Sequence, residues 1–321
     1  MRTGLLILLL LCGGPRLSAQ NAEEARVYRL AGGETLSYSR PGLWRTLSAG
    51  PSDWGRFAGA AFSRRGLPWL ATVGASTLVL IEYDQKLHVN AGKAGRKLNI
   101  SSKDRTKTYL KIGGVSILRG PDDLGSALYF LGDGWINLGL MAGFETTGWL
   151  KDDWRAAQTG HQLAEGLLVT GFTTQVVKRV TGRETPSAAS APRGVWRMFP
   201  SFKEFQSHRT RYDAMPSGHM ATGMMTITVI SANYPDNKYI RPVGYALLAG
   251  LGFQMVNNGV HWASDYPLGL AVGYGIGKAI AAGGKTAARR ASGSPDPRPA
   301  VSFSPYLPAG GGAGVELACR F

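Results

Sequence analysis

The chain contains a series of apolar segments that are long enough for helices and too long for ordinary strands. The clearest covers residues 152–180, where apolar side chains recur at mixed three- and four-residue spacing, the pattern of a helix with a buried face. Gly182 and Pro186 follow and should end it. The other segments are 66–81, 126–144, 220–233, 243–256 and 267–282. Together they predict an all-α fold, a bundle of about six helices.

Two of these segments bear on the question of a membrane. Residues 66–81 are apolar and uncharged, and they fall just short of the ~20 residues that a spanning helix needs, so a buried helix and a tilted membrane helix are both open. Residues 126–144 carry Asp133 and Asn137 in the middle. An unpaired carboxylate in hydrocarbon is costly, so this helix is expected to pack against protein.

The composition changes on both sides of the helical region. Residues 1–19 have the pattern of a secretory signal, with a positive residue, an apolar run and a small-residue exit at Ala19. Residues 88–123 are basic and rich in glycine, and we expect an irregular segment with a short helix near 106–115. The predicted parts are a signal peptide (1–19), an extended lead-in with one or two short helices (20–63), a helical domain (64–283), a linker (284–300) and a terminal β-hairpin (301–321).

Charge and cysteine content limit the partners. The formal charge of +15 falls to +13 without residues 1–19, and such a field favours anionic surfaces or phosphate-bearing substrates. No nucleic-acid-binding motif accompanies it, so nucleic acid is not expected as a ligand. Cys319 is the one cysteine beyond residue 19, which excludes a disulfide framework or a cysteine metal site within one chain. We expect an exported protein, periplasmic or membrane-associated.

Two short segments carry the parts of a phosphate site. Lys178 and Arg183 place positive charge after a predicted helix, and cations stabilise the oxygens of a transferring phosphoryl group. Ser217, Gly218 and His219 stand just before the helix at 220–233, where backbone N–H groups and the helix dipole favour an anion. Gly218 allows close approach, Ser217 adds a hydroxyl, and His219 can protonate a leaving oxygen.

A third segment supplies a nucleophile. His261 can attack phosphorus and form a phosphohistidine, a covalent strategy open to imidazole. Asp265 can accept a hydrogen bond from the far ring nitrogen and so fix the tautomer. The four-residue spacing puts both on one face if the segment is helical. Pro267 suggests that the regular helix begins only there, so the pairing can also rest on a turn.

The three segments together resemble the superfamily of type-two phosphatidic-acid phosphatases and vanadium-dependent haloperoxidases, over about residues 120–283. That family is a helical bundle whose site is formed by three motifs: a lysine, six residues and Arg-Pro; Pro-Ser-Gly-His; and Ser-Arg, five residues, His, three residues, Asp. The resemblance implies that Lys178, Ser217 and Gly218 bind phosphate, His219 is the general acid, His261 the nucleophile and Asp265 its orienting partner.

Two positions depart from the family pattern. Thr185 stands where the arginine of the first motif belongs, and Met255 where that of the third belongs, with Gln254 replacing its serine. A threonine or a thioether does not reproduce bidentate guanidinium contacts. Arg183 is the first candidate substitute, and Arg209 or Arg211 can also reach the site.

The leading hypothesis is a phosphatase that hydrolyses a phosphomonoester or diphosphate through a phosphohistidine. The substrate is expected to be a phosphorylated lipid or a small phosphate ester, with an anionic membrane surface as a second partner. Neither a cofactor nor a metal is expected, since phosphohistidine chemistry needs none. The alternatives are a non-catalytic phosphate- or lipid-binding protein with a degraded arginine clamp and, less favoured, a vanadium-dependent haloperoxidase.

Overall fold

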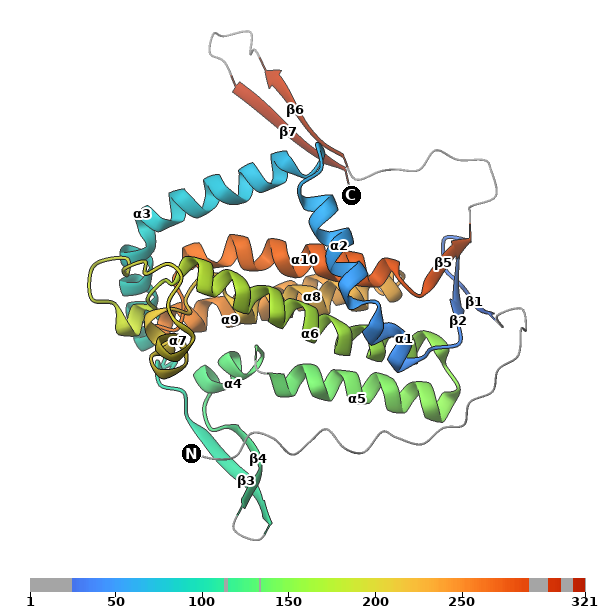
Figure 1. Ribbon diagram of the computed structural model, residues 1–321, viewed down its shortest axis with the longest axis horizontal. Helices are drawn as coiled ribbons and strands as arrows, with labels where there is room; N and C mark the ends of the chain where they lie inside the picture. Colours follow the sequence, from blue (N-terminus) through green and yellow to red (C-terminus); the bar gives the residue numbers. More distant parts are fainter. Residues whose placement is uncertain (1–24, 113–114, 133, 289–299, 307–313, 321) are drawn as a thin grey trace.

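The computed structural model describes residues 25–112, 115–132, 134–288, 300–306 and 314–320. In these residues the fold is mainly helical, which confirms the predicted all-α bundle (Figure 1). The helices are α1 (Leu43–Ser48), α2 (Gly50–Ala61), α3 (Leu67–Lys97), α4 (Leu124–Phe130), α5 (Gly134–Lys151), α6 (Trp154–Thr181), α7 (Phe202–Ser207), α8 (Gly218–Asn233), α9 (Ile240–Asn257) and α10 (Tyr266–Ala282). The predicted signal peptide lies outside the described residues.

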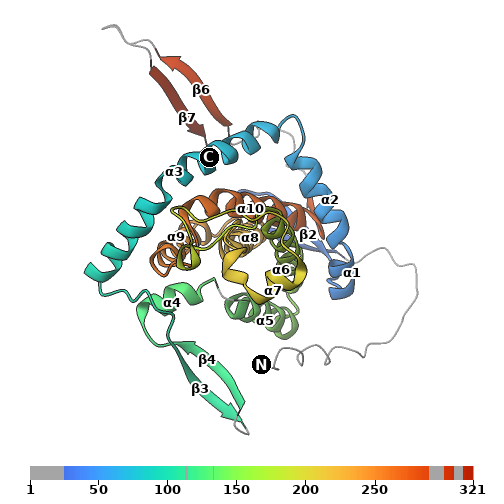
Figure 2. The same cartoon turned by 60° about the vertical axis from the view of Figure 1, so that its left-hand side comes forward.

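The centre of the bundle is formed by α6, α8, α9 and α10, with α5 along one side and α2 and α3 along the other (Figure 1). One core cluster joins α6, α8 and α10 and a second joins α8 to α9. Glycine brings α8 and α10 together, since a Cβ at Gly273 would lie 2.1 Å from the Ala221 carbonyl oxygen. Figure 2 shows this core close to end-on, with α3 passing around its outside and α7 over the near end.

Three small antiparallel sheets lie beside the bundle. The strands are β1 (Ala25–Arg29), β2 (Thr35–Ser39), β3 (Thr106–Ile112), β4 (Val115–Pro121), β5 (Lys285–Ala288), β6 (Ala300–Tyr306) and β7 (Gly314–Arg320). The orders are β1-β2-β5, β3-β4 and β6-β7. The pair β6-β7 is the predicted C-terminal hairpin. The helix expected near 106–115 is wrong, because residues 106–112 and 115–121 form the antiparallel strands β3 and β4.

The predicted helix positions hold better than the predicted lengths. α3 continues to Lys97, well past residue 81, because Glu, Gln, Lys, Arg, Leu and Ala, which are good helix formers, make up more than half of the residues that follow the apolar run. The single helix expected over 126–144 is two, α4 and α5. The start of the predicted linker is β5, which pairs with β2. The lead-in contains a hairpin in addition to the short helices α1 and α2.

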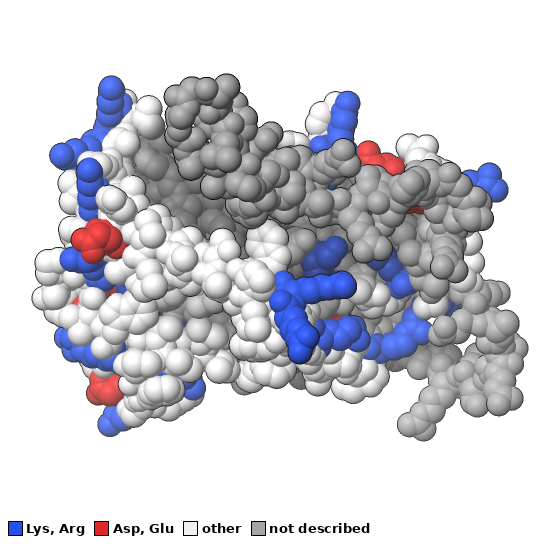
Figure 3. Space-filling view, turned by 90° about the horizontal axis from the view of Figure 1, so that it is seen from above, with Lys and Arg blue, Asp and Glu red and all other residues white. Residues whose placement is uncertain are grey.

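Large apolar side chains are exposed on several faces of the bundle. They include Leu78 of α3, Trp149 of α5, Phe172 of α6 and Val243 of α9. In Figure 3 the Lys and Arg side chains gather in separate groups around a broad uncharged area. Among the described residues, no helix is both long enough and apolar enough to cross a membrane.

Candidate active site

Lys178 is placed by the end of α6. Asp153 caps the start of this helix by accepting hydrogen bonds from the N–H groups of Arg155 and Ala156. Gly182 ends it in the left-handed conformation, with φ of 53°. Lys178 is buried one turn earlier, and its Nζ lies 3.9 Å from an oxygen of Asp213. Burial lowers the pKa of Lys178, while the carboxylates of Asp213 and Asp265 act in the opposite direction.

The start of α8 forms a second wall of the site. Ser217 is its N-cap, with Oγ 3.4 Å from the N–H of Met220 and its own N–H donating to the Asp265 carbonyl oxygen at 3.1 Å. The first N–H groups of a helix lack acceptors within the helix and attract anions. A Cβ at Gly218 would meet one atom within 4 Å, the Thr174 hydroxyl at 3.9 Å. A ligand can therefore approach this backbone closely.

His261 is held in one tautomer by the main chain. Its Nδ1 lies 2.7 Å from the carbonyl oxygen of Ala214, and the ring is almost fully buried. A carbonyl oxygen only accepts, so Nδ1 carries the proton and Nε2 keeps its lone pair. Asp265, the partner expected from the sequence, is also beside Nδ1 but at 3.4 Å. The closer orienting contact comes from Ala214.

His219 faces His261 across the site. Their ring centroids are 6.0 Å apart with the planes at 72°, and the ring of Tyr129 lies 5.2 Å from His219 on another side. Burial lowers the pKa of His219 to about 3, and the positive charges of Lys178 and of a protonated His261 would act in the same direction. The imidazole of the free protein is therefore neutral at neutral pH. A bound anion would raise its pKa again.

Arg183 does not face this site. Its guanidinium is fully buried and donates to Asp265 Oδ1 at 2.7 Å, to Asp84 Oδ2 at 2.6 Å and to the Arg193 carbonyl oxygen at 3.0 Å. Ser264 Oγ is 2.6 Å away. The prediction that Arg183 binds phosphate needs correction, because two carboxylates already neutralise its charge.

Asp84 is the residue that sequence reasoning missed. It lies in α3 and is buried. Asp84 Oδ1 accepts the backbone N–H of Ser264 at 3.0 Å. Asp84 Oδ2, which also accepts from Arg183, accepts the hydroxyl of Ser264. Asp84 and Asp265 hold Arg183 between them. One acidic residue at the end of an apolar run gives no sign of a partner 99 positions away, so no local pattern identifies it.

The two positions that lack the family arginines supply no charge in the structure. Thr185 is buried, and its N–H donates to the Thr210 carbonyl oxygen at 2.9 Å. Met255 is buried with its sulfur 3.9 Å from Ser217 Oγ. The bond to Thr210 brings the exposed turn Arg209–Arg211 against Thr185, and the positive charge of Arg209 is close enough to lower the pKa of Lys178.

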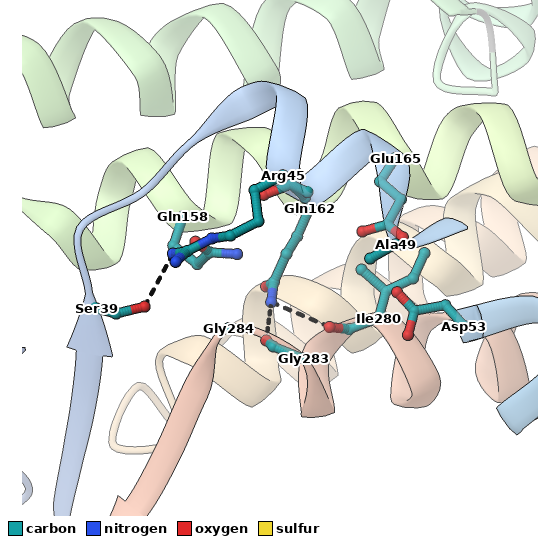
Figure 4. Close-up of a pocket in the computed structure, with 11 residues that line it drawn as sticks. Ser39, Arg45, Ala49, Asp53, Gln158, Gln162, Glu165, Ile280, Gly283 and Gly284 are labelled. Atoms are coloured by element: carbon teal, nitrogen blue, oxygen red, sulfur yellow. Dashed lines mark hydrogen bonds between the residues drawn. The ribbon is translucent and has the colours of Figure 1, made fainter. Parts of the chain in front are cut away.

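A separate cavity lies toward the other end of α6, among α1, α2, α6 and α10 (Figure 4). Its volume is about 270 Å³ and its lining is polar, with Arg45, Gln162 and Glu165. Glu165 is buried with one carboxylate oxygen lacking a hydrogen-bond partner in the described part of the chain. Burial raises the pKa of Glu165 to about 7, and the nearby Arg56 opposes this. None of the residues assigned to phosphate chemistry lines it.

Comparison with known proteins identifies the region that carries the histidines. The family model described as the PAP2 superfamily matches residues 160–288. This part of the chain resembles the PAP2 superfamily. The PAP2 region contains Lys178, Ser217, His219, His261 and Asp265, whereas Asp84 lies before it. Members of the PAP2 superfamily are generally phosphatases, and the match supports a phosphatase-type function.

Other comparisons give more distant likeness. The crystal structure described as the first transmembrane PAP2 type phosphatidylglycerolphosphate phosphatase, from Bacillus subtilis, is similar with a TM-score of 0.38 and 13% sequence identity. The alignment covers 73% of this chain and 94% of that one. No curated protein matches the chain.

Proposed function

We propose that the protein is a phosphatase that hydrolyses a phosphomonoester or diphosphate through a phosphohistidine on His261. The observation that carries the proposal is the hydrogen bond of 2.7 Å from His261 Nδ1 to the Ala214 carbonyl oxygen. This bond leaves the lone pair on Nε2, and a second imidazole stands across the site with its centroid 6.0 Å away. A fixed nucleophile beside a proton carrier suits covalent phosphoryl transfer.

In the first step Nε2 of His261 attacks phosphorus and the bond from phosphorus to the leaving oxygen breaks. His219 gives that oxygen its proton, so the alcohol leaves neutral. His219 is deprotonated in the free protein, where its pKa is about 3. The negative charge of the arriving phosphate raises the pKa of His219, and the proton that charges the ring comes from the substrate monoanion or from water.

In the second step water attacks phosphorus, His219 takes a proton from it, and the bond from phosphorus to Nε2 breaks. Inorganic phosphate leaves, His219 releases this proton to the departing phosphate or to water, and both histidines return to their starting state. The equatorial oxygens are stabilised by the ammonium of Lys178, the hydroxyl of Ser217 and the N–H groups that begin α8. Arg209, on the turn beside Thr185, supplies the guanidinium that neither Thr185 nor Met255 provides.

Arg183 acts as a positioning residue. It binds Asp265, whose second oxygen accepts the Trp262 N–H at 2.8 Å, and thereby holds the turn that carries His261. Asp84 fixes the other side of the guanidinium and the backbone of Ser264. Substrate contact is assigned to Lys178, Ser217, Gly218 and Arg209.

The charge and the exposed apolar side chains of the protein support a lipid-linked substrate. The chain is basic, with a formal net charge of +15, and exposes apolar side chains on α3, α5, α6 and α9. Basic and apolar side chains exposed on one protein favour anionic lipid headgroups together with their chains. We therefore place the protein at a membrane surface outside the cytoplasm, as the residues of the N-terminal segment suggest.

The test is phosphate release from phosphatidic acid, an isoprenyl diphosphate and a small aryl phosphate. Wild-type protein is compared with His261→Ala and with the matched control His208→Ala, whose ring is exposed and pairs with Glu204. Loss of release in His261→Ala alone, with an acid-labile phosphoprotein in quenched wild-type reactions, is expected. Equal rates in all three proteins would refute the mechanism. Tight phosphate binding without release would identify a binding protein.

A further inference from the structure

The polar cavity of Figure 4 is built from parts of the chain that lie far apart in the sequence. Its walls come from β2, α1, α2, α6 and α10, and its volume of about 270 Å³ is the liquid volume of about nine water molecules. Arg45 and Gln158 lie at one end of the cavity, and Asp53 and Glu165 lie at the other (Figure 4). The cavity therefore has the size and the lining to hold a small polar molecule.

Glu165 is the side chain of this cavity that lacks a partner. It is only 2% exposed, and no residue that the structure describes donates a hydrogen bond to its Oε1. Figure 4 shows its carboxylate turned into the cavity toward Ala49. An ionised carboxylate that is buried without a partner is costly, and burial accordingly raises the pKa of Glu165 to about 7. A ligand that donates to Oε1 would remove this cost.

The other charged groups around the cavity have partners within the protein. Asp53 is buried and forms an ion pair with Arg56, one turn along α2. Arg45 of α1 donates at 2.9 and 2.8 Å to the end of β2 and to the residue after it. α10 contributes no charged side chain to the described lining. Glu165 is thus the carboxylate of the described lining that is left to pair with a ligand.

A primary ammonium group fits this lining better than a metal ion. Ca²⁺ takes about six to eight oxygen ligands. The described residues contain no group of three or more His, Cys, Asp or Glu side chains that could hold a metal ion. An ammonium group needs acceptors for only three N–H bonds, and Glu165 supplies one. The carbonyl oxygens of Ile280 and Gly283 accept from Gln162 at 3.1 and 2.8 Å, so each keeps a second lone pair.

The remaining charges limit the ligand to one positive group. Arg45 stands at the end of the cavity away from Glu165, and Arg56 lies close enough to Glu165 to oppose the rise of its pKa. A second positive charge on the ligand would be repelled by these guanidinium groups. An uncharged polar group suits the far end, because the buried amide of Gln158 offers both donors and an acceptor.

We propose that this cavity binds a small primary ammonium compound, with its ammonium group on Glu165 and an uncharged polar group toward Gln158. None of the residues assigned to phosphate chemistry lines the cavity, so the inference does not depend on the proposed function. The ligand contacts α1, α2, α6 and α10 at once and should stabilise their packing. A positive charge beside Glu165 favours the ionised carboxylate, so binding should strengthen as the pH rises through the pKa of about 7.

The experiment measures the binding of ethanolamine to the full chain by NMR titration at pH 6 and pH 8. The affinity of the wild type should rise about tenfold between these values, because the ionised fraction of Glu165 rises by that factor around a pKa of about 7. Ethylene glycol replaces the ammonium group with a hydroxyl, and putrescine carries a second positive charge. Both should bind at least tenfold more weakly than ethanolamine at pH 8.

Two variants test the cavity itself. Glu165→Gln keeps the size of the side chain and should weaken binding at least tenfold and remove its pH dependence. Ala49→Leu fills the cavity and leaves Glu165 in place, and it should also weaken binding. The matched control is Glu204→Gln, since Glu204 lies outside the cavity and is 52% exposed. It should bind ethanolamine as the wild type does, and so should His261→Ala.

The pH dependence of the wild type needs no variant, and its absence overturns the inference. Equal ethanolamine binding by the wild type and the two folded cavity variants also overturns it. Ethylene glycol that binds as tightly as ethanolamine would identify a site for neutral polyols. Calcium chloride that raises Tm where ethanolamine does not would identify a metal site, and either result refutes the ammonium site. Loss of binding in His261→Ala would move the amine to the histidine site and refute the cavity assignment.

Discussion

Substitution Asp84→Asn tests whether a residue of α3 organises the active site. Asp84 and Asp265 hold the fully buried guanidinium of Arg183, with separations of 2.6 and 2.7 Å. Asparagine keeps the size of the side chain but removes its charge and one acceptor that faces Arg183. Removing one partner of a buried pair leaves a charge uncompensated, which costs about 3–5 kcal/mol when no second partner exists. Because Asp265 remains, we expect the lower end, about 3 kcal/mol.

The assay is urea unfolding, with catalysis measured on the folded variant. In thermal unfolding, the same loss of about 3 kcal/mol lowers Tm by roughly 5–10 °C. The matched control is Glu82→Gln, two residues earlier on α3, where Glu82 pairs with Arg193 and both side chains are well exposed. That change should cost less than about 1 kcal/mol. In the folded Asp84→Asn protein kcat should also fall while KM changes less, because the turn that carries His261 shifts.

Equal stability losses in Asp84→Asn and Glu82→Gln would refute the reasoning. So would a destabilised Asp84→Asn protein with unchanged kcat, since Asp84 would then support the fold without positioning the His261 segment. Asp84→Glu, which keeps the charge, should recover part of the activity if charge compensation is the cause.

Three further predictions follow from the site and the polar cavity. Glu165→Gln should stabilise the protein above pH 7 by up to about 3 kcal/mol and have little effect near pH 4.5. Because the pKa of Glu165 is about 7 in the folded protein, the stability of the wild type falls as the pH rises from 4.5 to 7 and the buried carboxyl ionises. Urea unfolding at both pH values checks this prediction. NMR of labelled histidine should show His219 neutral from pH 5 to 8 in the free protein, and its pKa should rise when orthovanadate binds; no rise would remove its role as acid. Arg209→Ala should lower kcat/KM by about 100-fold and Arg211→Ala by much less; equal rates would remove Arg209 from the site.

Much of the fold can be predicted from local patterns. The helices at α6, α8, α9 and α10 follow from apolar spacing, and Gly182 ends α6 as expected because its left-handed conformation suits glycine. The failures are also local in origin. Apolar and polar side chains alternate in Leu110-Lys111-Ile112 and in Val115-Ser116-Ile117, and the Gly-Gly pair between them is a hairpin signal that the prediction of a helix there overlooked. The polar half of α3 shows no boundary at residue 81.

The sequence alone determined which residues are available for chemistry: Lys178, Ser217, His219 and His261 in their order, the first three at the end of α6 and the start of α8 and the last between α9 and α10. The tertiary structure decided what Arg183 does, and it also selected Ala214 as the closer partner of His261 and joined Asp84 to the site. These contacts form between residues 47 and 99 positions apart. Such contacts depend on how helices pack and on which buried charge needs neutralising, and neither is encoded in a short run of residues.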